Sequence, residues 1–142
     1  MMDPFRLQRF VDAQQYDYTT ALLELQMGQK RSHWMWYIFP QLKGLGRSST
    51  AEYYGISSME EAEAYLSHPV LGPRLIEAAE AVAQHGDKSA EAIMGYIDAM
   101  KLRSCMTLFN AAAPDIPIFQ EVLELFYQGK PDDQTLHILG EL

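Results

Sequence analysis

The sequence predicts an all-α protein, a bundle of about seven to nine helices with an irregular aromatic and glycine-containing segment. Apolar residues recur at helical spacing along most of the chain, and no segment alternates apolar and polar residues as a half-buried strand does. Helix-starting and helix-ending residues separate these segments. Because 142 residues suffice for one core and no repeat or linker divides the chain, we expect a single domain over residues 1–142.

Two helices are expected first, over residues 4–14 and 18–27. Asp3 followed by Pro4 is a favourable helix start, because the aspartate carboxylate can cap the first turn and proline is tolerated at the first helical position. Arg9 lies on the face opposite the apolar stripe of the first helix. Gly28 ends the second helix, because glycine readily adopts the left-handed conformation that closes helices.

The remaining chain contains further helix signals. A helix capped by Ser48 or Ser49 runs to residue 54, and Ser57-x-x-Glu60 predicts a capping box that opens a helix to residue 66. Glu61, in this helix, is expected on its surface. Later helices are expected over 71–84, 89–94 and 98–111, from 115 to before 129, and from 131 onwards.

Residues 30–56 are the most unusual stretch in composition. They contain both tryptophans, and the bulky residues 33–39 show no clean period, so that run fits a helix or a strand equally well. Between Glu24 and Glu52 there are four basic residues and no acidic one, a net charge of +4 against −12 for the rest of the chain. This favours a small anionic ligand over an extended nucleic acid, although chance clustering on a solvated loop is the alternative.

Other features of the composition indicate in which part of the cell the protein is expected. The single Cys105 allows no internal disulfide and is expected to be a buried thiol, which suits the cytoplasm. The N-terminus has no signal-peptide pattern, and the chain contains no apolar run long enough for a membrane span. The four histidines are scattered without metal-ligand spacing, so no metal and no cofactor are expected.

The turn from Gly44 to Ser49 is a candidate anion site. Glycines allow backbone N–H groups to turn inward, and an arginine offers a fork that matches phosphate. The residues that would hold the anion are Gly44, Gly46, Arg47 and Ser48. The pattern is neither a Walker loop nor a dinucleotide-binding fingerprint, and a plain turn capped by serine explains it equally well.

The aromatic run and a later helix supply the other candidates. Trp34 or Trp36 could stack a flat ring, and Gln41 could hydrogen-bond its edge, unless these residues form only core. Asp98 and Lys101 lie one turn apart and could face the same site. The alternative is a surface ion pair next to a solvated Arg103. The candidates for proton transfer are His33, Glu52 and Asp98.

Four segments together resemble a bacterial family of unknown function, whose members are small, mainly α-helical proteins sometimes mislabelled calpastatin. The segments are LQRFVDAQ, SHWMWYIFPQLKGLGRSS, YLSHPVLGPRL and DAMKLRSCMTLF. A disordered inhibitor such as calpastatin would not have this apolar content. The family implies no established activity. The chain is also similar to helical N-glycosidases linked to NAD and ADP-ribose, a resemblance that would place Glu52 of SSTAEYYGI at an acidic position of the site.

Two hypotheses of function follow. The first is a pocket for a small anionic, nucleotide-like molecule such as ADP-ribose, which extends to hydrolysis or N-glycosidase chemistry on ADP-ribose derivatives. The second is a non-catalytic protein-interaction module that uses residues 33–39 to bind an unknown partner protein. The patterns alone do not decide whether the protein is an enzyme.

Overall fold

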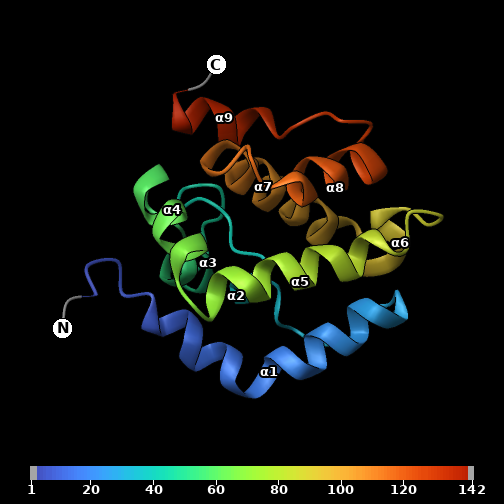
Figure 1. Cartoon of the computed structure of the whole chain (residues 1–142), viewed down its shortest axis with the longest axis horizontal. Coiled ribbons are helices and arrows are strands. Elements are labelled where there is room, and N and C mark those ends of the chain that lie inside the picture. Colours follow the sequence, from blue (N-terminus) through green and yellow to red (C-terminus); the bar gives the residue numbers. More distant parts are fainter. Residues whose placement is uncertain (1–2, 141–142) are drawn as a thin grey trace.

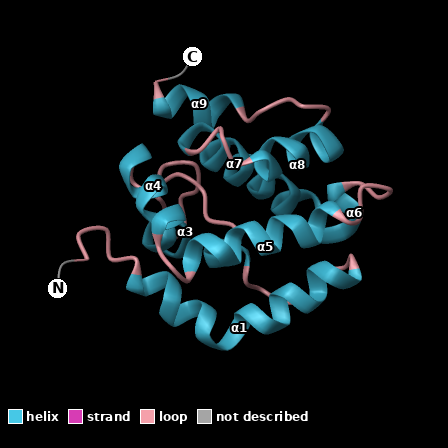
Figure 2. Cartoon of the chain, viewed as in Figure 1, coloured by secondary structure: helices cyan, strands magenta, loops and turns pink. Residues whose placement is uncertain are grey.

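The chain folds into nine α-helices within residues 3–140, the part that the computed structural model describes (Figures 1 and 2). The helices are α1 (Gln8–Met27), α2 (Met35–Ile38), α3 (Ser49–Tyr54), α4 (Met59–Ser67), α5 (Leu71–Ala83), α6 (Ala90–Met94), α7 (Tyr96–Ala112), α8 (Pro117–Tyr127) and α9 (Asp133–Leu139). The only β pairing within these residues is one isolated parallel bridge. The predicted all-α fold is therefore confirmed.

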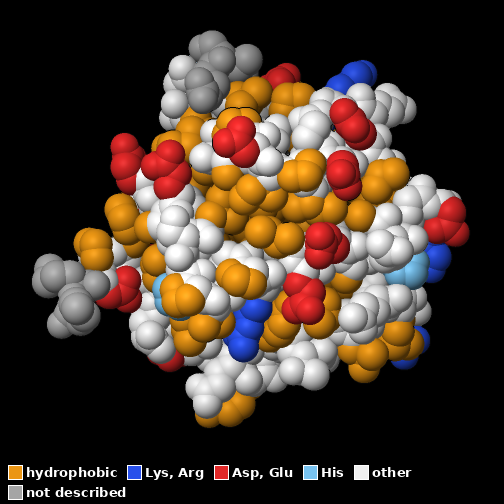
Figure 3. Space-filling view, in the orientation of Figure 1, with side chains coloured by type: hydrophobic (Ala, Val, Ile, Leu, Met, Phe, Trp, Pro, Cys, Tyr) orange, Lys and Arg blue, Asp and Glu red, His pale blue; other side chains and the backbone are white. Residues whose placement is uncertain are grey.

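Helix α7 is the centre of the bundle. It contacts α4, α6, α8 and α9, while α5 lies between α1 and α8 (Figure 1). Because neighbours surround α7, its apolar residues are buried on more than one side, as the sequence predicts. Leu102, Cys105, Met106 and Phe109 are all fully buried. On the face shown in Figure 3, acidic side chains outnumber basic ones, in keeping with the net charge of −8.

The first helix differs from the prediction. Residues 4–14 and 18–27 do not form two helices, because one continuous helix, α1, spans Gln8–Met27. No glycine or proline interrupts residues 14–18, so nothing breaks the backbone hydrogen bonding there. The predicted start at Pro4 is wrong, since α1 begins at Gln8, but the carboxylate of Asp3 still accepts from the amides of Leu7 and Gln8 at 2.9 and 3.1 Å. Gly28 ends α1 with φ of +74°, as expected.

A buried ion pair fastens α1 to α4. Arg9 Nη2 lies 2.8 Å from Glu61 Oε2, and both side chains are at least nine-tenths buried. The other guanidinium N–H groups donate to backbone carbonyls of Phe5, Arg6, Tyr53 and Gly55. The second oxygen of Glu61 accepts from the amide and hydroxyl of Ser57. The prediction of Glu61 on the surface is wrong, as is the placement of Arg9 on a face away from the core.

The loop between α2 and α3 is held in place by backbone contacts. Lys43 N donates to the carbonyl of Ile56 at 2.8 Å, and Ile56 N donates to that of Gln41 at 2.9 Å. Ser48 caps α3 by accepting from the amide of Ala51. Ser58, rather than the predicted Ser57, caps α4 by accepting from the amide of Glu61, while the side chain of Glu61 accepts from the amide of Ser57.

The carboxylate of Glu24 anchors the segment that follows α1. It accepts hydrogen bonds from the amides of Arg31 and Ser32, from Ser32 Oγ and from Trp34 Nε1, at distances of 2.6–3.0 Å. Burial by itself raises the pKa of this carboxyl group, but the hydrogen bonds outweigh burial and lower the pKa to about 2. The anchored segment leads directly into the single helical turn of α2.

We expect Glu24→Gln to lower the free energy of unfolding by roughly 2 to 3 kcal/mol at pH 7. The pKa is lowered from 4.5 in the unfolded chain to about 2 in the folded one. The stabilisation is therefore complete above pH 5 and is lost as the pH falls through 4.5 towards 2. Urea unfolding at pH 7 and at pH 3 should show a smaller difference between variant and wild type at the lower pH. Glu80→Gln, at an exposed position of α5, is the control, and a pH-independent deficit would contradict this prediction.

Replacing Arg9 tests the ion pair. Arg9→Met should cost about 3 to 5 kcal/mol of unfolding free energy, because it leaves the charge of Glu61 buried without a partner. Arg9→Met combined with Glu61→Leu should recover part of that loss, since no uncompensated charge remains. The measurement is urea unfolding at neutral pH, with the exposed Arg31→Met as control. A cost below about 1 kcal/mol for Arg9→Met alone would show that the pair does not fasten α1 to α4.

Candidate functional site

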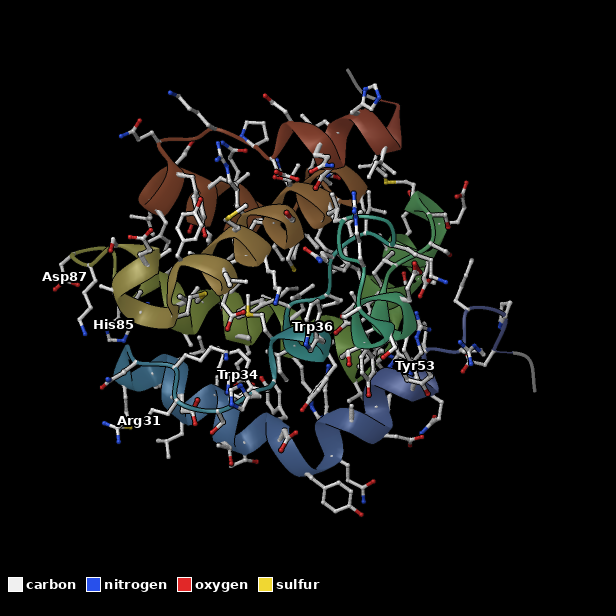
Figure 4. All side chains as sticks on the ribbon, turned by 180° about the vertical axis from the view of Figure 1, so that it is seen from behind. Arg31, Trp34, Trp36, Tyr53, His85 and Asp87 are labelled. Atoms are coloured by element: carbon white, nitrogen blue, oxygen red, sulfur yellow. The ribbon has the colours of Figure 1, made fainter. Side chains whose placement is uncertain are left out.

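A pocket of about 330 Å³ opens between the first half of α7, the loop after α2 and the start of α9. Its volume is at the lower end of the range for small-molecule sites. Trp36 lies near the middle of the face seen in Figure 4. The residues that line the pocket are Trp36, Gln41, Leu45, Gly46, Ile97, Met100, Lys101, Arg103, Ser104, Asp132 and Gln134.

Trp36 and Lys101 form the wall contributed by α2 and α7. Lys101 Nζ lies 3.7 Å from the centre of the Trp36 ring, close enough for a cation–π contact. The turn of α2 is fixed because its neighbouring residues Met35 and Ile38 are buried in the core. A half-buried indole and an ammonium group are thus presented to the pocket together.

Asp98 lies between two lysines behind this wall. Its carboxylate is 2.9 Å from Lys30 Nζ and 3.4 Å from Lys101 Nζ. The ion pair with Lys101 forms one turn apart on the helix, as predicted. It is only partly exposed and includes Lys30, so it is not a simple surface pair. Lys30 Nζ also lies 4.9 Å from the centre of the Trp34 ring, which links the pocket wall to the core.

Arg103 is the second cation of the pocket. It is half-buried, its Nε donates to the carbonyl of Lys130 at 2.9 Å, and its guanidinium lies 5.6 Å from the centre of the Tyr127 ring. Within residues 3–140 it has no carboxylate partner, and its two Nη groups make no hydrogen bond. Arg103 is therefore held to the backbone only through Nε, and its Nη groups are left to solvent or a ligand.

Asp132 is a pocket residue that sequence reasoning missed. It caps α9, and its Oδ2 accepts from Ser104 Oγ at 3.2 Å and from Thr135 N at 3.0 Å. The other oxygen, Oδ1, makes no hydrogen bond with residues 3–140. The sequence signal at Asp132 was that of a helix start. Nothing in the pattern indicated that α9 would meet α7 and the loop after α2.

The structure brings several predicted ligand-binding residues together and leaves others apart. The pocket is lined by Trp36, Gln41, Gly46 and Lys101. Four other predicted binding residues, Trp34, Gly44, Arg47 and Ser48, do not line it. Trp34 cannot stack a ligand, because it is fully buried and donates to Glu24. Gly44 has φ of +100° with open space around it, and the side chain of Ser48 is used as a cap.

The three residues proposed for proton transfer do not share the pocket. Asp98 adjoins it through Lys101, whereas His33 and Glu52 are exposed and do not line it. Cys105 is buried as predicted, and burial raises the pKa of its thiol. Among the residues described, no three His, Cys, Asp or Glu side chains are grouped to hold a metal ion. None of the described helices is long and apolar enough to cross a membrane.

Comparison with known proteins gives a family and a fold. A family model for a protein of unknown function, DUF1810, matches residues 4–139. The chain is similar to the conserved hypothetical protein Rv1873 from Mycobacterium tuberculosis, known from a crystal structure, with 49% identity and a TM-score of 0.96. The match covers 97% of this chain and 99% of that one. No curated protein matches the sequence of this chain. With nearly its whole length matched, the chain belongs to the DUF1810 family of proteins of unknown function.

Proposed function

We propose that the pocket at Trp36 binds a small anionic ligand that carries a flat ring, of the kind found in nucleotides. The observation that carries the proposal is the meeting of an aromatic ring and two cations, Lys101 and Arg103, in one pocket of a chain with a net charge of −8. Aromatic stacking and fixed cations together recognise nucleotides in many unrelated proteins.

The ring of the ligand would lie against Trp36. Stacking of a base on an aromatic side chain contributes about 1 to 3 kcal/mol. Gln41 lines the same wall, and its amide can donate to or accept from the edge of a base. Gly46 lets the loop pack closely on α3, because a Cβ there would lie 2.7 Å from the Cβ of Ala51.

The anionic group of the ligand would contact Lys101 and Arg103. Lys101 is already held in place by Asp98 and the Trp36 ring, so little side-chain entropy remains to be lost on binding. Arg103 offers its Nη groups in a fork that suits a phosphate. Asp132, on the same wall, can accept hydrogen bonds from sugar hydroxyl groups through Oδ1.

A hydrolase or N-glycosidase acting on ADP-ribose derivatives is the enzymatic form of this proposal. Cleavage at a ribose passes through an oxocarbenium-like state, which a nearby carboxylate stabilises. Asp132 supports this role better than Glu52, since it lines the pocket and Glu52 does not. The alternative of a protein-interaction module has less support, because Trp34, Met35, Ile38 and Phe39 are buried and leave little of residues 33–39 for a partner.

Ligand titration tests the binding proposal. AMP, ADP, ADP-ribose and NAD are added while the melting temperature and tryptophan fluorescence are recorded. A ligand at 100 times its Kd adds about 2.7 kcal/mol of stability. Trp36→Phe should abolish the fluorescence change, since Trp34 is buried, and Lys101→Met should raise Kd roughly tenfold, a loss of about 1.4 kcal/mol.

Lys88→Met, at an exposed position, serves as the control for Lys101→Met and should leave Kd unchanged. The proposal is abandoned if millimolar nucleotides and inorganic phosphate all leave both signals unchanged. It is equally abandoned if Lys88→Met and Lys101→Met weaken binding to the same extent.

Hydrolysis is tested with the same ligands. Chromatography after incubation with NAD or an ADP-ribose glycoside should reveal cleavage, and Asp132→Asn should slow it at least a hundredfold. Asparagine caps a helix as well as aspartate does, so α9 should remain folded. Asp133→Asn, at the neighbouring exposed position of α9, is the matched control. Equal rates for Asp132→Asn and wild type would remove Asp132 from the chemistry and leave only the binding function.

A further inference from the structure

A second pocket adjoins the one at Trp36. It has a volume of about 380 Å³ and lies between the start of α7 and the end of α8. Three aromatic side chains contribute to its wall, Tyr96, Phe126 and Tyr127. The two pockets share Met100 and Arg103, so these two side chains separate them.

The helical period of α7 explains why the pockets lie side by side. Ile97, Lys101 and Ser104 lie at successive i, i+4 and i+7 positions and face the Trp36 pocket. Tyr96, Ala99 and Arg103 lie at i, i+3 and i+7 positions along the neighbouring stripe and face the second pocket. The first half of α7 thus presents Lys101 to one pocket and Tyr96 to the other, with Arg103 lining both.

The surface between the pockets is apolar and accessible. Tyr96 is 65% exposed, Ile97 67% and Met100 54%. Three large apolar side chains within five residues of one helix form a patch of the kind that usually marks a binding surface. Arg103 lies in this patch, with its Nε fixed by the carbonyl of Lys130 and its Nη groups unpaired within residues 3–140.

From this arrangement we propose that the natural ligand occupies both pockets and consists of two ring systems joined by one or two phosphates. One ring lies against Trp36, the joining phosphate contacts Arg103, and the second ring lies against Tyr96 and Tyr127. This inference rests on the proposed binding function and adds the class of ligand. The net charge of −8 disfavours a long polyanion, so the proposed ligand is a small molecule or a short end of a chain.

Calorimetric titration with matched probes tests the inference. The probes are AMP, with one ring, ApA, with two adenosines joined by a phosphodiester, and diadenosine diphosphate, with two joined by a diphosphate. At least one two-ring probe should bind ten or more times tighter than AMP. Whichever binds tighter identifies the linkage, and either result supports the proposal.

Substitution in the second pocket distinguishes binding at the Trp36 pocket alone from binding across both pockets. Tyr96→Ala, at an exposed position that lines only the second pocket, should weaken the two-ring probe at least fivefold and leave AMP unchanged. Arg103→Met should weaken both kinds of probe. Tyr16→Ala, an 81% exposed tyrosine on α1, is the control and should change neither.

The possible failures are distinguishable. If AMP binds and the two-ring probes bind no tighter, or if Tyr96→Ala has no effect on them, the two-pocket ligand is rejected while the proposed function remains. If none of the three probes binds at millimolar concentration, the inference fails, and if ADP, ADP-ribose, NAD and inorganic phosphate also fail to bind, the proposed function fails with it. A two-ring probe that binds tightly but is insensitive to Trp36→Leu would place its site elsewhere and reject both.

Discussion

The buried carboxylate of Glu24 determines how the aromatic segment meets the rest of the molecule. A buried carboxylate costs free energy unless it is fully hydrogen-bonded, and four donors from residues 31–34 satisfy this one. The chain can therefore leave α1 only along a path that brings those donors to Glu24. That path fixes the start of α2, and with it the direction of both tryptophans. The candidate pocket depends on this interaction although Glu24 does not line it.

Two tryptophans that are two positions apart consequently have different roles. Residues at that spacing on a helical turn point to nearly opposite sides, and Trp34 faces the core while Trp36 faces the pocket. Glu24 holds the first indole, and Lys101 lies over the second. Asp98 joins the two environments, since it pairs with Lys30 beside Trp34 and with Lys101 over Trp36. The two environments are therefore linked through a single carboxylate.

Local chemistry determined what the sequence could predict. Helix ends such as Gly28 and Ser48 were predictable because each residue ends or caps a helix through its own conformation or through a hydrogen bond to a nearby backbone amide. The pairing of Arg9 with Glu61 was not, because the partners are 52 positions apart and each pattern alone looks like helix surface. Residues 33–39 could not be resolved into core and pocket, since a helix of one turn has no period to detect. Asp132 and Arg103 join the site only through the packing of α9 and α8 around α7, which no local pattern records.

The charges around the pocket leave room for an anion. Asp98 is shared by Lys30 and Lys101, so this group of three retains one positive charge, and Arg103 has no carboxylate partner within residues 3–140. Asp132 offsets one of these two positive charges. The Arg103 side chain is half-buried, and its Nη groups have no partner within residues 3–140, so they are available to a ligand. Although the chain carries an excess of acidic residues, none within residues 3–140 forms an ion pair with Arg103. The proposed anionic ligand would supply a counter-charge at Arg103, and this is the reason for proposing phosphate rather than a neutral molecule.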